Sequence, residues 1–327
     1  MPTLPSTSIA IVTHRRPDAL RDMLASLAAA RFPPSVTQAL VIENGDPDCG
    51  SRDVAAAAAL PLAVRWHHLA DSRVSVSRNF GVAEAGGDFV VIYDDDVRIG
   101  AEALTAYVAA AAEFGPGHFF GGPIVPRQDV APPEWLSAYL PASARGWTLG
   151  AERRIVDAPV FLGANLAAFR SDILAAGGFP EYLGTGQDYV VGGEETCLQQ
   201  RMLDQGMKGV FVPDAVVQHH VPAERCTPAF ALDRYFSYLV TSEIARHVEK
   251  DISPSRLPPR WVWRQFLTSY VKALWRRLGM RDEQARFGAD LDLCAPRAQF
   301  AARAIMARHH LYDRYGRSAP KRARHEH

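Results

Sequence analysis

Apolar runs and helical patterns alternate along the first part of the chain. Four short runs of apolar, often β-branched residues are typical of buried strands: 8–12, 39–42, 63–67 and 89–93. Between them, apolar residues recur three and four positions apart, which predicts helices over 20–27, 54–60 and 77–85. This alternation predicts βαβ units, and therefore an α/β fold with a mixed, mainly parallel sheet flanked by helices.

The pattern changes after about residue 120. Residues 121–141 are rich in Pro and Gly and predict a long irregular segment. Further on, the sequence predicts two helices and two strands, over 171–176, 194–203, 209–212 and 214–218. From about 229 to the C-terminus the pattern is helical, so we expect a C-terminal helical extension.

Polar clusters follow three of the predicted strands. They begin at Thr13, Glu43 and Asp94. In parallel sheets, ligands bind beyond the carboxyl ends of the strands, so we expect these clusters to meet in one cleft.

The sequence Asp94-Asp95-Asp96 places three like charges directly after an apolar strand. Adjacent carboxylates in a partly desolvated cleft repel one another unless a cation compensates them. Carboxylate oxygens favour Mg²⁺ or Mn²⁺, and Mg²⁺ commonly joins a few carboxylates to substrate phosphates. The triplet is therefore a candidate metal–diphosphate site, and a solvated acidic turn is the alternative.

Two further pairs could carry chemistry. Glu194-Glu195 begins a predicted helix, where the helix dipole favours acidic residues; one of the two could instead be a general base. The adjacent residues His219 and His220 point to opposite faces of an extended segment, so one of them can reach the cleft as a metal ligand.

Together these segments resemble family 2 glycosyltransferases, which have the GT-A fold. The resemblance covers residues 8 to about 228, and the order and spacing of the segments make it specific. The segments are SIAIVTHRRP (8–17), VIENG (41–45), SRNFG (77–81), DDD (94–96), GAN (163–165), GF (178–179), EET (194–196) and VQH (217–219). His14, Arg15, Glu43 and Glu195 depart from the family's commonest residues at their positions.

The resemblance implies inverting transfer of a sugar from a nucleoside diphosphate sugar to an acceptor hydroxyl, with Mg²⁺ or Mn²⁺. It also implies a GT-A (Rossmann-like) catalytic domain over 1–228, with a nucleotide-binding part to about 125 and an acceptor-binding part over 126–228, followed by the extension over 229–327. The residues expected to contact the donor are Thr13, Arg15, Glu43, Arg73, Arg78, Asn79, Asp94 and Asp95. Metal ligands are expected at Asp96, Asp94 and His219, acceptor contacts at Gly163, Asn165 and Trp135, and the catalytic base at Glu195 or its neighbour Glu194. Glu43 would accept a hydrogen bond from the base edge, which favours a UDP-type donor.

Two other functions fit parts of the pattern. A strand followed by Asp94-x-Asp96 also resembles the nucleophile loop of haloacid-dehalogenase-like phosphatases, although three βα-like segments precede it here. A sugar-nucleotide-binding protein without turnover would carry the same acidic triplet. Within the resemblance, the sequence QQRM at 199–202 is not the Gln-x-x-Arg-Trp segment of processive synthases, which favours a non-processive enzyme that builds a glycan, exopolysaccharide or glycolipid.

The 327 residues carry 36 Lys+Arg and 36 Asp+Glu, but the two signs are unevenly distributed. Residues 254–327 hold 16 Lys+Arg and 6 Asp+Glu. A basic end on an acidic body indicates contact with something anionic or docking on the body itself. Scattered cysteines, with no apparent signal peptide or membrane span, favour a cytoplasmic protein, and no nucleic-acid module is evident.

Residues 260–278 predict an amphipathic helix with an apolar stripe. The stripe comprises Trp263, Phe266, Leu267, Tyr270, Val271, Leu274 and Leu278, flanked by Trp261, Trp275 and basic side chains. Aromatic and basic residues together are typical of a helix at an anionic membrane surface, here the inner face. The alternative is that the stripe packs on the catalytic domain or on a second subunit of a homo-oligomer. A lipid-linked acceptor would suit the first interpretation, and a carbohydrate acceptor fits either.

Overall fold

The computed structural model describes residues 3–189, 192–255, 257–279 and 282–316, and it divides the chain into two units. The first is an α/β unit, which consists of the chain up to Asp129 together with Ala142–Gly186 and Glu194–Val221. The second is a helical unit, which consists of Val130–Pro141, Gln187–Gly193 and the chain from Pro222 on. We expected the extension to start at 229 as one continuous segment. The helical unit instead starts at Pro222 and includes two shorter segments from the middle of the chain.

The α/β unit is built on an eight-stranded sheet. Its strand order is β3 (Ala63–His68), β2 (Val36–Glu43), β1 (Thr7–Thr13), β4 (Phe89–Asp94), β9 (Asn165–Phe169), β6 (His118–Gly121), β10 (Lys208–Phe211) and β8 (Arg154–Val156). The four strands from β3 to β4 are parallel, while β9 runs antiparallel between β4 and β6. This arrangement confirms the predicted α/β class and mainly parallel sheet.

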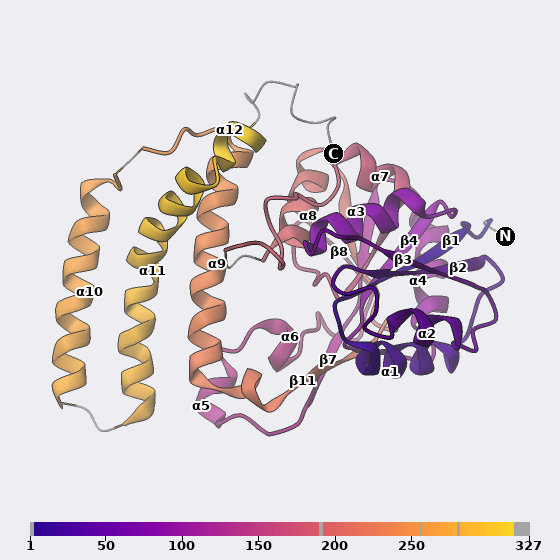
Figure 1. Ribbon diagram of the computed structural model, residues 1–327, viewed down its shortest axis with the longest axis horizontal. Coiled ribbons are helices and arrows are strands. Elements are labelled where there is room, and N and C mark those ends of the chain that lie inside the picture. Colours follow the sequence, from indigo (N-terminus) through magenta and orange to yellow (C-terminus); the bar gives the residue numbers. More distant parts are fainter. Residues whose placement is uncertain (1–2, 190–191, 256, 280–281, 317–327) are drawn as a thin grey trace. The chain divides into compact units, whose positions relative to one another are not determined.

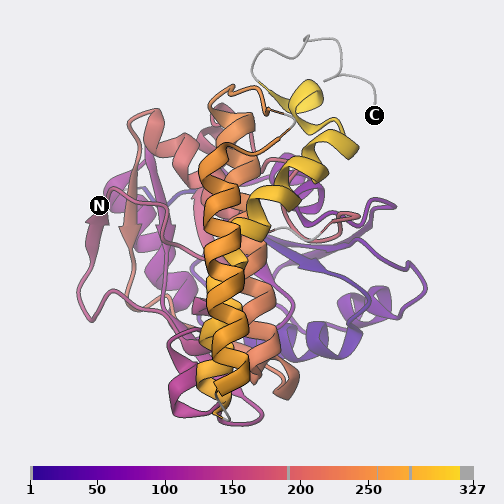
Figure 2. The same cartoon turned by 90° about the vertical axis from the view of Figure 1, so that its left-hand side faces the viewer.

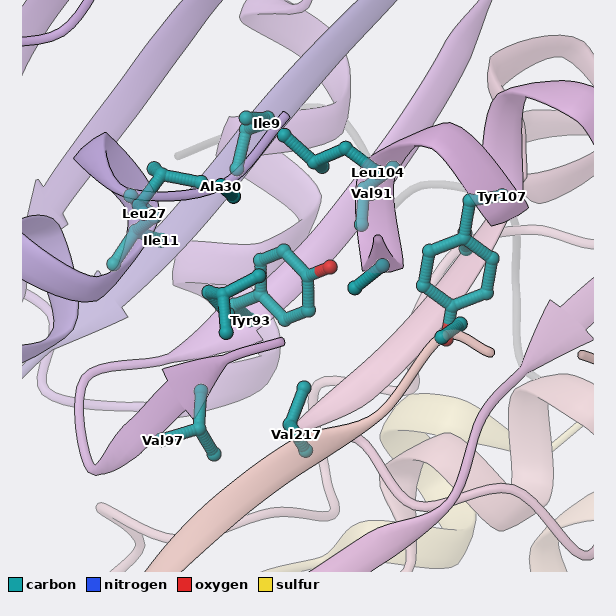
Figure 3. Close-up of a cluster of buried hydrophobic side chains, with 14 of the residues drawn as sticks. Ile9, Ile11, Leu27, Ala30, Val91, Tyr93, Val97, Leu104, Tyr107 and Val217 are labelled. Carbon is teal, nitrogen blue, oxygen red and sulfur yellow. The ribbon is translucent and has the colours of Figure 1, made fainter. Parts of the chain in front are cut away.

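Helices cover both faces of this sheet, because its central strands are apolar on both sides. One apolar core joins the sheet to α1 (Pro17–Ala28), α2 (Ser51–Ala56) and α4 (Ala103–Phe114). Figure 3 shows part of it, with Ile9, Ile11 and Tyr93 from the strands facing Leu27 and Leu104 from the helices. The other core joins the sheet to α3 (Val74–Glu84), α7 (Arg170–Ala175) and α8 (Glu194–Asp204).

A second, three-stranded sheet lies beside the acidic segment. Its order is β5 (Val97–Ile99), β11 (Val217–Val221) and β7 (Ile124–Gln128). The irregular segment predicted over 121–141 therefore contains a strand, and the short helix α5 (Glu134–Ser137) as well. His219 and His220 lie inside β11 and not after it, because β11 begins three residues later than the apolar pattern predicted.

The helical unit contains three long helices: α9 (Pro228–Glu249), α10 (Arg260–Gly279) and α11 (Glu283–Arg308). The shorter elements are η1 (Ala223–Cys226) and α12 (Leu311–Tyr315), besides α5. Within this unit α11 packs against α9 on one side and α10 on the other, as Figures 1 and 2 show. Glu243 on α9 is buried against Arg246, His247 and Arg303, the last from α11. Among the helices of the described ranges, none is both long and apolar enough to cross a bilayer. The basic segment 321–324 lies outside these ranges.

Asn165 connects four parts of the α/β unit. It is buried at the start of β9, where its Oδ1 accepts a hydrogen bond from the Tyr107 hydroxyl at 2.7 Å. Its Nδ2 donates to the carbonyl oxygens of Pro123 and Ala215, which precede β7 and β11. These bonds use the whole amide group, so Asn165 secures the junction between the two sheets.

We expect Asn165→Ala to lower the free energy of unfolding by about 2–4 kcal/mol, because it leaves buried polar groups without partners. Urea denaturation with circular dichroism measures this change. A matched control is Asn→Ala at the partly exposed Asn79, whose bonds go to one loop only, and we expect the smaller loss there. Equal stability of Asn165→Ala and the wild type would contradict a structural role for Asn165.

Candidate active site

The acidic triplet lies where β4 turns into β5. Asp94 is the last residue of β4, and Asp95 and Asp96 form the turn. β1 runs parallel beside β4, so Thr13 at the end of β1 reaches the same point. Its hydroxyl donates to Asp95 Oδ2 at 2.7 Å. The ends of β1 and β4 therefore meet, as predicted.

Asp95 is fully buried beside a cation. Arg16 Nη2 lies 2.6 Å from Asp95 Oδ1. Burial nevertheless raises the pKa of the Asp95 carboxyl to about 7, because desolvation of its charged form outweighs the attraction of Arg16. Asp95 is thus placed to organise the turn and not to project into solvent.

Arg16 also contacts the third aspartate, with Nη1 3.0 Å from Asp96 Oδ2. The sequence comparison singled out Arg15 in this loop, yet Arg16 supplies the charge that neutralises the triplet. Arg15 is exposed to solvent, and its backbone has a left-handed conformation (φ 54°). Its backbone N–H donates a hydrogen bond to Glu43 Oε1. The need to neutralise three aspartates could have predicted that an arginine of this loop contacts them. The sequence does not show which of the neighbouring residues Arg15 and Arg16 makes the contact.

Arg78 is the centre of the site. Its guanidinium is almost completely buried and bonds to Asp94 at 2.8 Å and to Glu194. The two carboxylates hold the pKa of Arg78 above its ordinary value despite the desolvation that opposes its charge. Gly163 makes room for this group, because a Cβ there would lie 2.7 Å from the guanidinium nitrogens. The acidic turn and the start of α8, far apart in sequence, are joined through this one side chain.

Glu195 follows directly after this ion pair, in the first turn of α8. Its Oε2 is buried and has no hydrogen-bond partner among the residues that the structure describes. Burial and the negative charge of Glu194 raise the pKa of Glu195 to about 8, although the Arg78 charge opposes the rise. Glu194 is paired with Arg78, so the two adjacent glutamates differ in their surroundings. With a pKa of about 8, the Glu195 carboxyl group changes its protonation state close to neutral pH.

His219 is held beside Asp96 by strand pairing. β11 runs antiparallel to β5, with His219 opposite Val97, and the His220 backbone N–H donates to the Asp96 carbonyl. His219 Nε2 consequently lies 3.5 Å from Asp96 Oδ1, whereas His220 contacts Asp129. A carboxylate and an imidazole this close can share one divalent cation, with phosphate oxygens and water as its other ligands.

The structure does not bring the expected third ligand to this pair. Asp94 faces Arg78 instead, and within the described residues no group of three His, Cys, Asp or Glu is arranged to hold a metal. The donor set therefore fits a cation that is shared with a bound diphosphate, and not a site closed by protein ligands alone.

Several residues expected to touch the donor have structural partners instead. Glu43 is fully buried; its Oε1 accepts from the N–H groups of Arg15 and Gly45, and its Oε2 from Cys49. Asn79 pairs with both backbone groups of Phe179. Arg73 pairs with Asp71 and donates to the Glu181 carbonyl. These contacts hold the loops around the site, and contacts of these residues with the donor remain predictions.

The residues expected to contact the acceptor also have partners within the chain. Gly163 accommodates Arg78, and Asn165 is buried with its amide fully used. Trp135 belongs to α5 of the helical unit, where its ring packs edge-on against Phe287 at 5.4 Å. Local sequence does not reveal these roles, because each depends on partners distant in the chain.

Comparison with known proteins agrees with this arrangement. Residues 8–177, more than half of the chain, match the pattern that defines Glycosyl transferase family 2. The chain belongs to glycosyl transferase family 2. This glycosyltransferase is also 27% identical over 237 residues to the succinoglycan biosynthesis protein ExoM of Rhizobium meliloti (strain 1021), covering 70% of this chain and 71% of ExoM.

Solved structures show that the family 2 enzyme has a GT-A fold. The mannosyltransferase PcManGT from Pyrobaculum calidifontis, in complex with GDP-Man and Mn²⁺, aligns with a TM-score of 0.55 at 17% identity, over 93% of this chain and 87% of that protein. GalNAc-T7 with UDP, GalNAc and Mn²⁺ also aligns with 0.55, at 14% identity, over 94% of this chain and 58% of its own. TarS 1-349 of S. aureus aligns with 0.51 at 13% identity, over 91% of each chain.

We expect Arg78→Met to lower the free energy of unfolding of the transferase by about 3–5 kcal/mol, because it leaves Asp94 and Glu194 close together without their cation. Chemical denaturation at pH 7.5 measures the loss. Arg73→Met is the matched control, since its ion pair with Asp71 is partly exposed and should cost less than about 1 kcal/mol. Equal losses in the two variants would contradict the central place of Arg78.

Proposed function

We propose that this enzyme transfers a sugar, with inversion, from a nucleoside diphosphate sugar to an acceptor hydroxyl, with a divalent cation at Asp96 and His219. The observation that carries the proposal is the buried, unpartnered carboxylate oxygen of Glu195 next to the Arg78–Glu194 ion pair. A carboxyl group in that state can remove a proton from an incoming alcohol.

The chemistry assigned to the chain is a single displacement. Glu195 takes the acceptor O–H proton as the acceptor oxygen bonds to the anomeric carbon, and the bond from that carbon to the diphosphate oxygen breaks. The bound Mg²⁺ or Mn²⁺ would supply Lewis-acid stabilisation of the charge that develops on the diphosphate. Arg78 pairs with Glu194 and so partly offsets the effect of that carboxylate on the base. Thr13 and Arg16 hold the turn that carries Asp96.

For the donor, we propose only that it carries a diphosphate group. Mn²⁺ accompanies GDP-Man in one structural neighbour and UDP in another, which supports a cation–diphosphate site without selecting the base. Arg15, exposed in the loop after β1, is the residue we assign to the donor phosphates. Since Glu43 is occupied by backbone N–H groups, base selection is assigned to other parts of the cleft.

We propose a non-processive enzyme of exopolysaccharide, glycan or glycolipid assembly that acts at the cytoplasmic side of a membrane. The similarity to a succinoglycan biosynthesis protein supports an acceptor that is a growing carbohydrate, free or lipid-linked. Family membership sets aside the phosphatase and the binding protein without turnover. The contact of Asp94 with Arg78 also leaves that carboxylate poorly placed as a phosphatase nucleophile.

We expect Glu195→Gln to lower kcat by about 10²–10⁴, because the amide cannot accept the acceptor proton. Binding of a nucleoside diphosphate with Mn²⁺, measured by calorimetry, should stay within about threefold of the wild type. Asp96→Asn should have the opposite signature, with Mn²⁺-dependent binding weakened about tenfold or more. Glu84→Gln, at an exposed position on α3, serves as the charge-matched control.

The pH dependence provides a separate readout of the same variant. Because the pKa of Glu195 is about 8 and the ionised form is the base, kcat/KM should rise about tenfold per pH unit below pH 8 and level off above it. The residual activity of Glu195→Gln should lack this slope. A pH slope retained by Glu195→Gln would remove Glu195 from the mechanism.

A further inference from the structure

Helix α10 has apolar side chains that remain exposed after it packs against α11. Its packed face consists of residues spaced three and four apart: Val262, Phe266, Ser269 and Ala273. They face α11, where Phe300 lies 5.8 Å from Phe266 between ring centroids. Small residues at 269 and 273 let the two helices approach closely.

A second apolar face follows the first, one residue further at every step. Its members are Leu267, Tyr270 and Leu274, with Trp263 at its inner edge, where the Trp263 ring also packs against Phe300 of α11 at 4.7 Å between centroids. Val271, Trp275 and Trp261 continue the exposed apolar surface further round the helix. One residue corresponds to about 100° of rotation, so this face points away from the packed one. Leu267 is 62% exposed and Trp275 is 73% exposed. Among the described side chains, the stripe predicted from the sequence is thus largely exposed, although Phe266 is directed into the packed face and Trp263 contacts Phe300.

This exposed face, defined by the seven residues above, is bordered by positive charge only. No Asp or Glu occurs from Arg260 to Gly279, while Arg260, Arg264 and Lys272 are exposed on α10. The sequence adds Arg276 and Arg277, whose side chains lie outside the described residues. Monomeric proteins rarely leave a continuous apolar face of this kind uncovered.

The charges select among the surfaces that could cover this face. In a two-fold symmetric dimer the same patch lies on both subunits, so an α10–α10 contact would oppose cations with cations and offer no acid to compensate them. An anionic bilayer has the complementary charge. Tryptophan and tyrosine favour the boundary between headgroups and acyl chains, and arginine and lysine reach phosphate groups from there.

We propose that the exposed face of α10 binds the surface of an anionic lipid bilayer, with the helix lying in the plane of the interface. About 1 kcal/mol per cation is typical of such attraction, which corresponds to about fivefold in partitioning for each Lys or Arg. This inference goes beyond the proposed transferase function and does not depend on it. It assigns a role to the apolar side chains of α10 that stay exposed beyond the packing of this helix on α11.

The test uses the full chain and sedimentation with vesicles of phosphatidylcholine alone or with about one third phosphatidylglycerol. We expect partitioning into the anionic vesicles to exceed that into neutral ones at least about tenfold, and to fall in about 1 M NaCl. The double variant Trp261→Ser/Trp275→Ser and the double variant Arg264→Glu/Lys272→Glu should each lose about tenfold or more. Tyr238→Ser, 64% exposed on α9, is the matched aromatic control and should change partitioning less than twofold.

Two outcomes would overturn the proposal. One is equal, weak partitioning of the wild type into both kinds of vesicle. The other is a wild-type dimer in light scattering that the tryptophan variant turns into a monomer without any vesicle binding, which would assign the face to a second copy. Mn²⁺-dependent binding of a nucleoside diphosphate is measured in the same variants. Its retention shows that they are folded, and its absence from the wild type would count against the transferase function and not against the membrane surface.

Discussion

A guanidinium group that is almost completely buried requires carboxylates around it, and Arg78 has two of them from opposite ends of the site. Asp94 ends β4 and Glu194 begins α8, so one side chain links the end of β4 to the helix that carries Glu195. The acidic residues of the site can lie close together because two arginines neutralise them. Arg78 pairs with Asp94 and Glu194, and Arg16 pairs with Asp95 and Asp96. Removing either cation would leave like charges facing one another in a poorly solvated space.

Other features follow from this arrangement. Gly163 has no side chain because the Arg78 guanidinium occupies that space. β11 pairs with β5 so that His219 lies beside Asp96, and Asn165 fixes the segments that lead into β7 and β11. The glutamate next to the ion pair then carries a raised pKa, since it is buried beside another carboxylate while the nearest cation is already engaged. The ion pairs that hold the site together thus also set the electrostatic environment of Glu195.

The sequence was sufficient to predict the α/β class, the meeting of the ends of β1 and β4, and the acidic groups at 94–96 and 194–195. Strand periodicity and the order of motifs carry that information locally. It was insufficient for the partners of Arg78, because Asp94 and Glu194 are indistinguishable from solvated acids until the fold brings them together. Glu43 and Asn79 resemble ligand-binding residues by motif, yet their contacts with Gly45 and Phe179 show that they shape loops. The amphipathic pattern of α10 was visible, but only the position of α11 shows which of its two apolar faces is packed.

The most direct test of the charge network is a crystal structure with a nucleoside diphosphate and Mn²⁺, with the metal located by anomalous scattering. The account predicts one peak that contacts Asp96, His219 and the diphosphate, with Asp94 still bonded to Arg78. A metal that Asp94 binds after release from Arg78, or a diphosphate bound without metal away from Asp96, would contradict it.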